Sequence, residues 1–387
     1  MATDRTALPA TGTAKAAAAA TDAAPRADAA GTAPASRLSA GGLIALLSRR
    51  PISLYAASVL RIGYGLCYLA FLLRELPHRD EIWGPDSPWT PALADELFRQ
   101  TGWFSPLTLS DSTVYLDVCY AIALVVCALL VLGWRSRAMS VLFALVVVSF
   151  HARAIFMTDG GDNLILLMAL YLTCTACGRR WSLDARRTAR LAAGGGPGRW
   201  AMWRASSDTW SQFDLARRSL VTALHNCAMF VIAAQVCLLY GSAGLYKVQG
   251  PSWQSGTALH YVVNLDLFRP WPALSALADS HPLFIAAASY LTVLIQVAFP
   301  FALFSRLKYV ILAMLLAMHL GIAALMGLPL FSGAMIVADA AFLPDRFYRS
   351  AARLLRRAIP HRPAGATAPR TPRVPPQPGT PGLTRHS

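Results

Sequence analysis

Charged residues are scarce in this sequence. They make up 14% of its 387 residues, whereas an ordinary soluble domain carries about 25%. Hydrophobic residues reach 55% and the mean hydropathy is +0.44. The apolar residues come in blocks close to the roughly 20 that a helix needs to cross a bilayer. The shortage of charge therefore excludes an ordinary soluble globular protein and predicts an all-α fold, a polytopic transmembrane helical bundle in the lipid bilayer.

Acidic residues are especially few, with 20 Asp and Glu against 35 Lys and Arg, so the net charge is +15. A strongly basic chain can be a nucleic-acid-binding protein. Here, however, the basic residues stand in loops beside hydrophobic segments, as signals of membrane topology do. We therefore expect no nucleic-acid partner.

The cysteines number seven, and all lie within or at the ends of hydrophobic blocks. An odd number in this setting excludes the disulfide framework of a small secreted domain. Cys174 and Cys177 have CxxC spacing, but no second such pair and no histidine lies near them in sequence. We expect them to pack as small apolar residues, and we predict no metal site.

Composition divides the chain into four regions. Residues 1–36 are rich in alanine and are predicted to be a disordered tail. Residues 37–53 place a short apolar run between basic ends, which is typical of an interfacial amphipathic segment. Residues 54–343 hold the hydrophobic blocks and form the predicted transmembrane domain. Residues 344–387 are basic and rich in proline, so a second disordered tail is predicted there.

About eight spans fit the transmembrane region. Assigning the loops alternately to the two sides puts 28 Lys and Arg on one side and six on the other, with Arg61 inside the first span. The positive-inside rule then makes both termini cytoplasmic in the cell membrane, and two long loops, 74–112 and 245–282, extracytoplasmic. The predicted spans are 54–73, 113–132, 138–156, 162–177, 220–244, 283–304, 309–328 and 330–343.

Two charged residues fall inside predicted spans. Arg61 lies near the middle of the first span, where a charge costs about 2.5–3.5 kcal/mol, so it must be paired or reach water. Asp339 lies in the last span at a matching depth and is the favoured partner. A structural ion pair between them is predicted, and direct participation in a polar cavity is the alternative.

Histidine and acidic side chains also occur at span positions. His319 lies in the middle of the seventh span, where we expect it either to form a hydrogen bond between helices or to line a ligand pocket. Asp162 and Asn163 begin the fourth span, where they form either a helix N-cap or part of the same pocket.

The stretch 240–263 combines small residues with a lysine and aromatic side chains. Lys247 follows Gly244 on one helical face at the outer membrane boundary, and Trp253, Gly256 and His260 follow it. A lysine that snorkels to the membrane surface is the simpler interpretation. The alternative is a polar pocket with aromatic walls over Lys247.

These residues, taken in order, resemble the HTTM domain of vitamin K-dependent gamma-carboxylase and its bacterial relatives. The similarity covers about residues 54–343. The matching positions are Arg61, the GP at 84–85, LGWRSR at 132–137, GGDN at 160–163, WSLD at 181–184, AGLYK…W…G at 243–256, Gln296, the FP at 299–300, His319, the FS at 331–332 and Asp339.

The resemblance implies a role for Lys247. In the carboxylase, the lysine of this motif is the base that deprotonates vitamin K hydroquinone, and a lysine removed from water can act as a base. His319 falls where the family carries an intramembrane histidine. The chain departs from the carboxylase at Leu164, where the family has a histidine, and at Tyr246, where the animal enzyme has a second lysine. It also lacks a counterpart of the large lumenal domain that engages protein substrates, which argues against carboxylation of glutamate.

Two functions follow from these residues. The first is a multi-pass HTTM membrane protein with an outward-facing pocket for a quinone or other lipophilic ligand, in which Lys247 is the base of a carboxylase-like, redox-coupled reaction. The quinone is the expected cofactor, and Trp253, His260, His319, Asp162 and Asn163 are the candidate pocket residues. The second is a non-catalytic membrane partner, such as an accessory or immunity-like protein that acts on a secreted peptide or a neighbouring enzyme. A third function, transport, is less favoured, because the sequence shows no spans broken by glycine or proline in matching halves.

Overall fold

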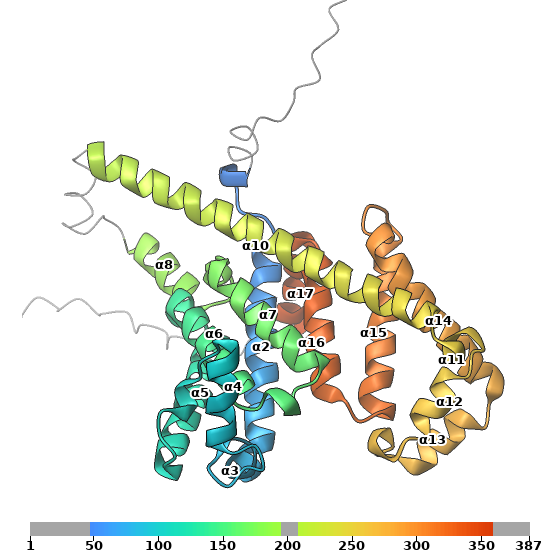
Figure 1. Ribbon diagram of the computed structural model, residues 1–387. Coiled ribbons are helices and arrows are strands. Elements are labelled where there is room, and N and C mark those ends of the chain that lie inside the picture. The colour runs from blue at the N-terminus through green and yellow to red at the C-terminus, as the bar shows by residue number, and fades with distance from the viewer. Residues whose placement is uncertain (1–46, 195–207, 359–387) are drawn as a thin grey trace, which may run out of the picture.

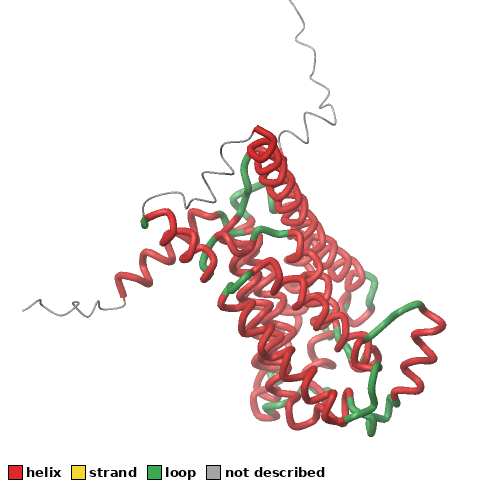
Figure 2. The backbone as a smooth tube through the Cα atoms, turned by 90° about the vertical axis from the view of Figure 1, so that its left-hand side faces the viewer, coloured by secondary structure: helices red, strands yellow, loops and turns green. Residues whose placement is uncertain are grey.

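The computed structural model describes residues 47–194 and 208–358, and every regular element within them is a helix. Figure 2 shows these helices joined by loops, without a strand in the described ranges. Six of the helices are long and apolar enough to cross a membrane. The prediction of an all-helical fold is therefore confirmed for the described residues, and the six long apolar helices agree with a multi-pass membrane protein. The predicted tail 1–36 and the beginning of the segment 37–53 lie outside the described residues.

The long apolar helices coincide with predicted spans to within a few residues, apart from the start of α10. They are α2 (Leu54–Glu75), α5 (Thr113–Leu132), α6 (Ser136–Arg153), α10 (Asp208–Val248), α14 (Pro282–Ala302) and α15 (Lys308–Leu325). Two further apolar helices are shorter, namely α7 (Gly160–Cys174) and α16 (Pro329–Asp339), which continues into the 3-10 turn η6 (Ala340–Phe342).

The connecting segments form short helices and turns. On the predicted outer side these are η1 (Leu76–His78), α3 (Arg79–Trp83), α4 (Pro91–Thr101), η2 (Pro106–Thr108), η3 (Ile155–Met157), α11 (Pro251–Gln254), α12 (Ala258–Val263), η5 (Asp266–Phe268) and α13 (Pro272–Asp279). The remaining elements are η4 (Cys177–Arg179), α8 (Leu183–Ala193) and α17 (Asp345–Ala358).

Helix α2 lies at the centre of one group of helices and packs against α5, α7 and α16, while α6 packs against α5 and α7 (Figure 1). Helix α10 runs obliquely across this group and contacts α7 and α14. Helices α14, α15 and α16 then follow in succession, each packed on the one before. The arrangement leaves α10, α14, α15 and α16 around a common space.

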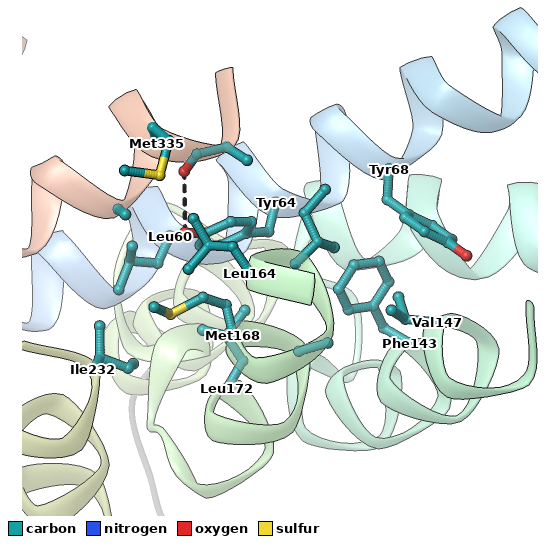
Figure 3. Packing of buried hydrophobic residues seen from close by; sticks show 14 of the residues in the cluster. Leu60, Tyr64, Tyr68, Phe143, Val147, Leu164, Met168, Leu172, Ile232 and Met335 are labelled. Atoms are coloured by element: carbon teal, nitrogen blue, oxygen red, sulfur yellow. Dashed lines mark hydrogen bonds between the residues drawn. The ribbon is translucent and has the colours of Figure 1, made fainter. Parts of the chain in front are cut away.

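The apolar core joins α2 to α7 and α16. Figure 3 shows Leu60 and Tyr64 of α2 beside Leu164 and Met168 of α7, with Met335 of α16 close by. The Tyr64 hydroxyl donates a hydrogen bond of 3.1 Å to the carbonyl oxygen of Ala334, so its polar atom is satisfied inside the core. Because lipid tails are as apolar as these side chains, the contacts stabilise the bundle through close van der Waals packing rather than through removal from water.

Helix α10 is longer than the sequence indicated. It has 41 residues and begins at Asp208, whereas the predicted span began at residue 220. Its added first turns are polar and are held by pairs in which Asp214 lies 2.8 Å from Arg217 and 2.6 Å from Arg218. Charged pairs three and four residues apart stabilise a helix but give no hydropathy signal. Hydropathy alone therefore places the start of this helix too late in the chain.

The C-terminal region also differs from the prediction. Residues 345–358 form the helix α17, where a disordered tail was predicted from residue 344. Asp345 begins this helix and its carboxylate accepts a hydrogen bond of 3.2 Å from the backbone of Tyr55 at the start of α2. A tertiary contact therefore holds a basic segment whose composition alone favours disorder. The rest of the predicted tail, 359–387, lies outside the described residues.

Candidate functional site

A cavity of about 690 Å³ lies between α10, α14, α15 and α16, and α11 and α12 close one end of it. We call it the main cavity. Its walls are mostly leucine, isoleucine, valine, methionine, alanine and phenylalanine side chains. The polar side chains among them are few: Asp159, Tyr240, Lys247, Thr292, Gln296 and His319. A largely apolar cavity of this size with a few polar groups is typical of a site for a small lipophilic molecule.

Lys247 lies in the last turn of α10 and lines the main cavity. Its ammonium nitrogen Nζ donates a hydrogen bond of 3.4 Å to the carbonyl oxygen of Ala243 and lies 5.4 Å from the centre of the Trp253 ring. None of the ion pairs formed between described residues involves it. A lysine without a carboxylate partner keeps its nitrogen free to meet a ligand.

Glycines allow the main cavity to close at its Lys247 end. Gly244 brings α10 against α14, because a Cβ atom there would lie 2.8 Å from a methyl carbon of Val297. Gly256 has a φ of +73°, and its Cβ would lie 3.1 Å from the Tyr290 ring. The Tyr290 hydroxyl in turn donates a hydrogen bond of 2.9 Å to the carbonyl oxygen of Gln254. The segment that carries Trp253 is thereby fixed on α14.

His319 lies on α15 and is part of a buried polar chain. Its Nε2 lies 2.9 Å from the hydroxyl oxygen of Tyr240, and that hydroxyl donates a bond of 3.1 Å to Oδ2 of Asp339. Because the tyrosine proton goes to the carboxylate, Nε2 carries the proton of the first bond and Nδ1 is left as an acceptor. Nδ1 has no hydrogen-bond partner among the described residues. His319 therefore presents an unused acceptor at the wall of the main cavity.

Gln296, on α14, is a second buried polar side chain of this wall. Its Nε2 lies 3.7 Å from the sulfur of Met318, and its Oε1 finds no partner in the described part of the chain. An unpaired buried polar atom costs about 1–3 kcal/mol. Oε1 of Gln296 and Nδ1 of His319 are thus two unpaired acceptors on side chains that line the main cavity, and both atoms are themselves buried.

The predicted ion pair between Arg61 and Asp339 is wrong. The guanidinium of Arg61 donates to the carbonyl oxygens of Leu130, Val131 at 2.8 Å and Trp181 at 2.7 Å. Leu130 and Val131 are in the last turn of α5, whose carbonyl groups carry the negative end of the helix dipole, and the Leu130 carbonyl also accepts a hydrogen bond of 3.0 Å from the backbone of Gly133. Asp339 is bound by Tyr240 instead. Arg61 is therefore bound by backbone carbonyl groups instead of the Asp339 carboxylate, and a sequence pattern does not indicate which carbonyl groups lie nearby.

Asp162 and Asn163 serve the start of α7. Asp159 is the N-cap, and its carboxylate accepts a hydrogen bond from the backbone N–H of Asp162. The Asp162 carboxylate in turn accepts a hydrogen bond of 3.0 Å from the backbone N–H of Asp159. Asn163 is exposed and donates a bond of 2.8 Å to the Asp159 carbonyl. Asp162 lines a separate, smaller cavity of about 310 Å³. The main cavity reaches Asp159 and Gly160 but neither of the two predicted residues.

His260 does not line the main cavity. Its Nδ1 lies 2.6 Å from a carboxylate oxygen of Asp279, and Asn264 donates a bond of 3.0 Å to the other oxygen. Hydrogen bonds from Asn264 and His260 lower the pKa of the Asp279 carboxyl. These three residues form a polar clasp between α12 and α13. The prediction of His260 as a pocket residue is wrong, because its ring faces the loop rather than the cavity.

The structure thus brings Lys247, Trp253 and His319 to one cavity, and adds Tyr240 and Gln296 to them. Tyr240 went unrecognised as a site residue, although it precedes Lys247 by seven residues, a spacing that puts both on one face of a helix. The fold and this cavity define a class, that of multi-pass helical membrane proteins with an apolar internal cavity. No family model, curated protein or solved structure matches the chain.

Proposed function

We propose that this chain is an HTTM-type protein of the cell membrane whose main cavity opens outward and binds a quinone or other lipophilic ligand, with Lys247 as the base. The observation that carries the proposal is the place of Lys247, on the wall of an apolar cavity and without an acidic partner among the described residues. Lys247, Trp253 and His319 all belong to the positions at which the sequence resembles the HTTM domain.

The chemistry of the proposal is a proton transfer. The neutral amine of Lys247 takes the proton of a ligand hydroxyl, which leaves an ammonium group and an oxygen anion. The Trp253 ring, 5.4 Å from Nζ, stabilises that ammonium by a cation–π interaction. A hydroquinone suits the cavity because its flat rings and apolar tail match the largely apolar walls.

The proposed topology has eight membrane crossings with both termini cytoplasmic. Six helices are long enough to cross a membrane, and in this proposal α7 and α16, with η6, form the two shorter crossings. The start of α17 lies at the start of α2, which agrees with cytoplasmic placement of both ends. From Arg218 to Lys247, α10 rises about 44 Å, close to the full thickness of a bilayer. Lys247 therefore faces outward if Arg218 is cytoplasmic.

Quinone binding can be measured on the full chain in nanodiscs. A short-chain naphthoquinone is added and the fluorescence of tryptophan is followed. Trp253 lines the cavity, so bound quinone should quench it, and Trp253→Phe should remove that part of the signal. If wild type and Trp253→Phe are quenched equally over the whole titration, the cavity is not the binding site and the proposal fails.

The role of Lys247 requires a separate measurement. Lys247→Arg keeps the positive charge but cannot release its proton, because the arginine pKa exceeds about 12. We expect it to bind a naphthohydroquinone, supplied already reduced and kept under anaerobic conditions, with nearly wild-type affinity but to lose formation of the hydroquinone anion, followed by absorbance. Lys308→Arg is the matched control, since Lys308 lies 5.3 Å from the Tyr309 ring and outside the cavity lining. If both variants form the anion as the wild type does, Lys247 is an anchor and not a base.

A non-catalytic membrane partner is the competing function. Mass spectrometry of the purified chain distinguishes the two. Co-purified quinone supports the proposal, whereas a reproducible protein partner together with failure of the naphthoquinone titration overturns it.

A further inference from the structure

Helix α17 presents arginines on one face and large apolar side chains on another. Arg346, Arg349 and Arg353 follow one another at helical spacing. The next face around the helix carries Phe347, Leu354 and Leu355, which are 50%, 64% and 64% exposed. A helix built in this way lies at a membrane surface, with its apolar face toward the acyl chains and its basic face toward the headgroups.

The arginine face borders a cavity of about 560 Å³, which we call the arginine cavity. Its lining is Tyr55, Trp181, Ala352 and the arginines 346, 349 and 353. None of the ion pairs formed between described residues involves these arginines. Three guanidinium groups around one space, with no carboxylate to balance them there, select an anion.

The arginine cavity is held by contacts from elsewhere in the bundle. Asp345 binds the backbone of Tyr55 and so fixes the start of α17 against α2. Tyr348, on the same helix, is buried, and its hydroxyl donates a bond of 2.5 Å to the Ala340 carbonyl. The Trp181 ring meets the rings of Tyr55 and Tyr348 edge to face, at 5.4 Å and 6.1 Å between centres. Figure 1 shows α17 beside α2 in this position.

We propose that the arginine cavity binds the phosphate group of an anionic phospholipid. Arginine forks hold phosphate oxygens through paired, charge-assisted hydrogen bonds. Tyrosine and tryptophan are the side chains that favour the headgroup level of a membrane. The exposed Phe347 and Leu354 would contact the acyl chains of the same lipid, and this contact favours a lipid over soluble phosphate as the ligand. The main cavity has no part in this site, which lies among α2, α17 and the segment with Trp181 that precedes α8.

The test uses native mass spectrometry of the full chain released from nanodiscs of phosphatidylcholine and phosphatidylglycerol in equal amounts. The variant carries Arg346→Gln, Arg349→Gln and Arg353→Gln. Its matched control carries the same three changes on α8, at Arg186, Arg187 and Arg190, which are exposed and lie outside the lining of the arginine cavity. Each arginine near an anionic lipid contributes about 1 kcal/mol, which corresponds to roughly fivefold in affinity.

We expect the α17 variant to lose roughly a hundredfold in retained phosphatidylglycerol, and the α8 variant to stay within about threefold of wild type. Equal retention by the two variants would overturn the proposal. Competition by inorganic phosphate identifies the source: phosphate that displaces the lipid completely at millimolar concentration would make the ligand a soluble phosphate and would refute the lipid assignment.

A single substitution keeps the test valid if the triple variant fails to fold. Arg349→Lys retains the charge and loses the planar fork. We expect it to keep wild-type thermal stability and to bind phosphatidylglycerol several-fold less tightly. Wild-type lipid retention by Arg349→Lys would show that only diffuse charge attracts the lipid, and the built phosphate site would be wrong.

Discussion

Arg61 and Asp339 should contribute to stability independently of each other, although both are buried charged residues of the bundle. Arg61→Met removes the donor of three carbonyl oxygens, those of Leu130, Val131 and Trp181. The Leu130 carbonyl keeps the backbone N–H of Gly133, whereas the Val131 and Trp181 carbonyls lose this donor. Each unpaired acceptor costs about 1–3 kcal/mol, so we expect a loss of about 2 kcal/mol or more in the free energy of unfolding. Asp339→Ala leaves the Tyr240 hydroxyl without its acceptor, a loss of about 2 kcal/mol.

The double variant distinguishes this arrangement from an ion pair. The two side chains share no hydrogen-bond partner, so their effects should add to within about 0.5 kcal/mol. An ion pair would give a coupling energy of about 1–3 kcal/mol instead.

Equilibrium unfolding in mixed micelles with increasing dodecyl sulfate measures all three variants. Arg99→Met is the control, because Arg99 is exposed on α4 and should have little effect. A coupling above about 1 kcal/mol, or rescue of stability by exchanging the two charges, would refute the assignment of Arg61 to the carbonyls.

Three further predictions concern the cavity wall and the outer loop. Gly244→Ala should lower the free energy of unfolding by about 1–3 kcal/mol in the same assay, because the added methyl group would meet α14. Gly321→Ala is the control: a Cβ atom there has no neighbour within 4 Å, so this change should be neutral or slightly stabilising. The pKa of Asp279 is lowered by its hydrogen bonds from Asn264 and His260, so the clasp is stabilising above the ordinary carboxyl pKa of about 3.9 and weakens as the pH falls below it. The hydrogen-exchange protection of residues 258–280, taken relative to the intrinsic exchange rate at each pH, should therefore fall on acidification in the wild type, and Asp279→Asn should abolish that change in protection. Tyr240→Phe should cost about 2 kcal/mol, because it leaves two buried polar groups without their shared partner, and a neutral result would show that the chain from His319 to Asp339 is not formed.

The sequence by itself determined which segments form the bundle. Helices α5 and α14 begin and end within about two residues of the predicted spans 113–132 and 283–304, because hydropathy over about 20 residues is a local property. It also identified Lys247, Trp253 and His319, which the structure places on one cavity. Their role in binding or catalysis stays a prediction.

The tertiary structure decided what each polar group meets. Arg61 binds the end of α5, and the sequence could not indicate this because every backbone carbonyl looks alike until the helices are packed. The first turns of α10 and the whole of α17 escaped prediction for a related reason, since their polar residues give no hydropathy signal and become ordered through pairs and contacts. The hydrogen bonds of Tyr240 likewise depend on α15 and α16 lying beside α10. Local composition fixes where helices form, whereas partners far apart in the chain are set only when those helices come together.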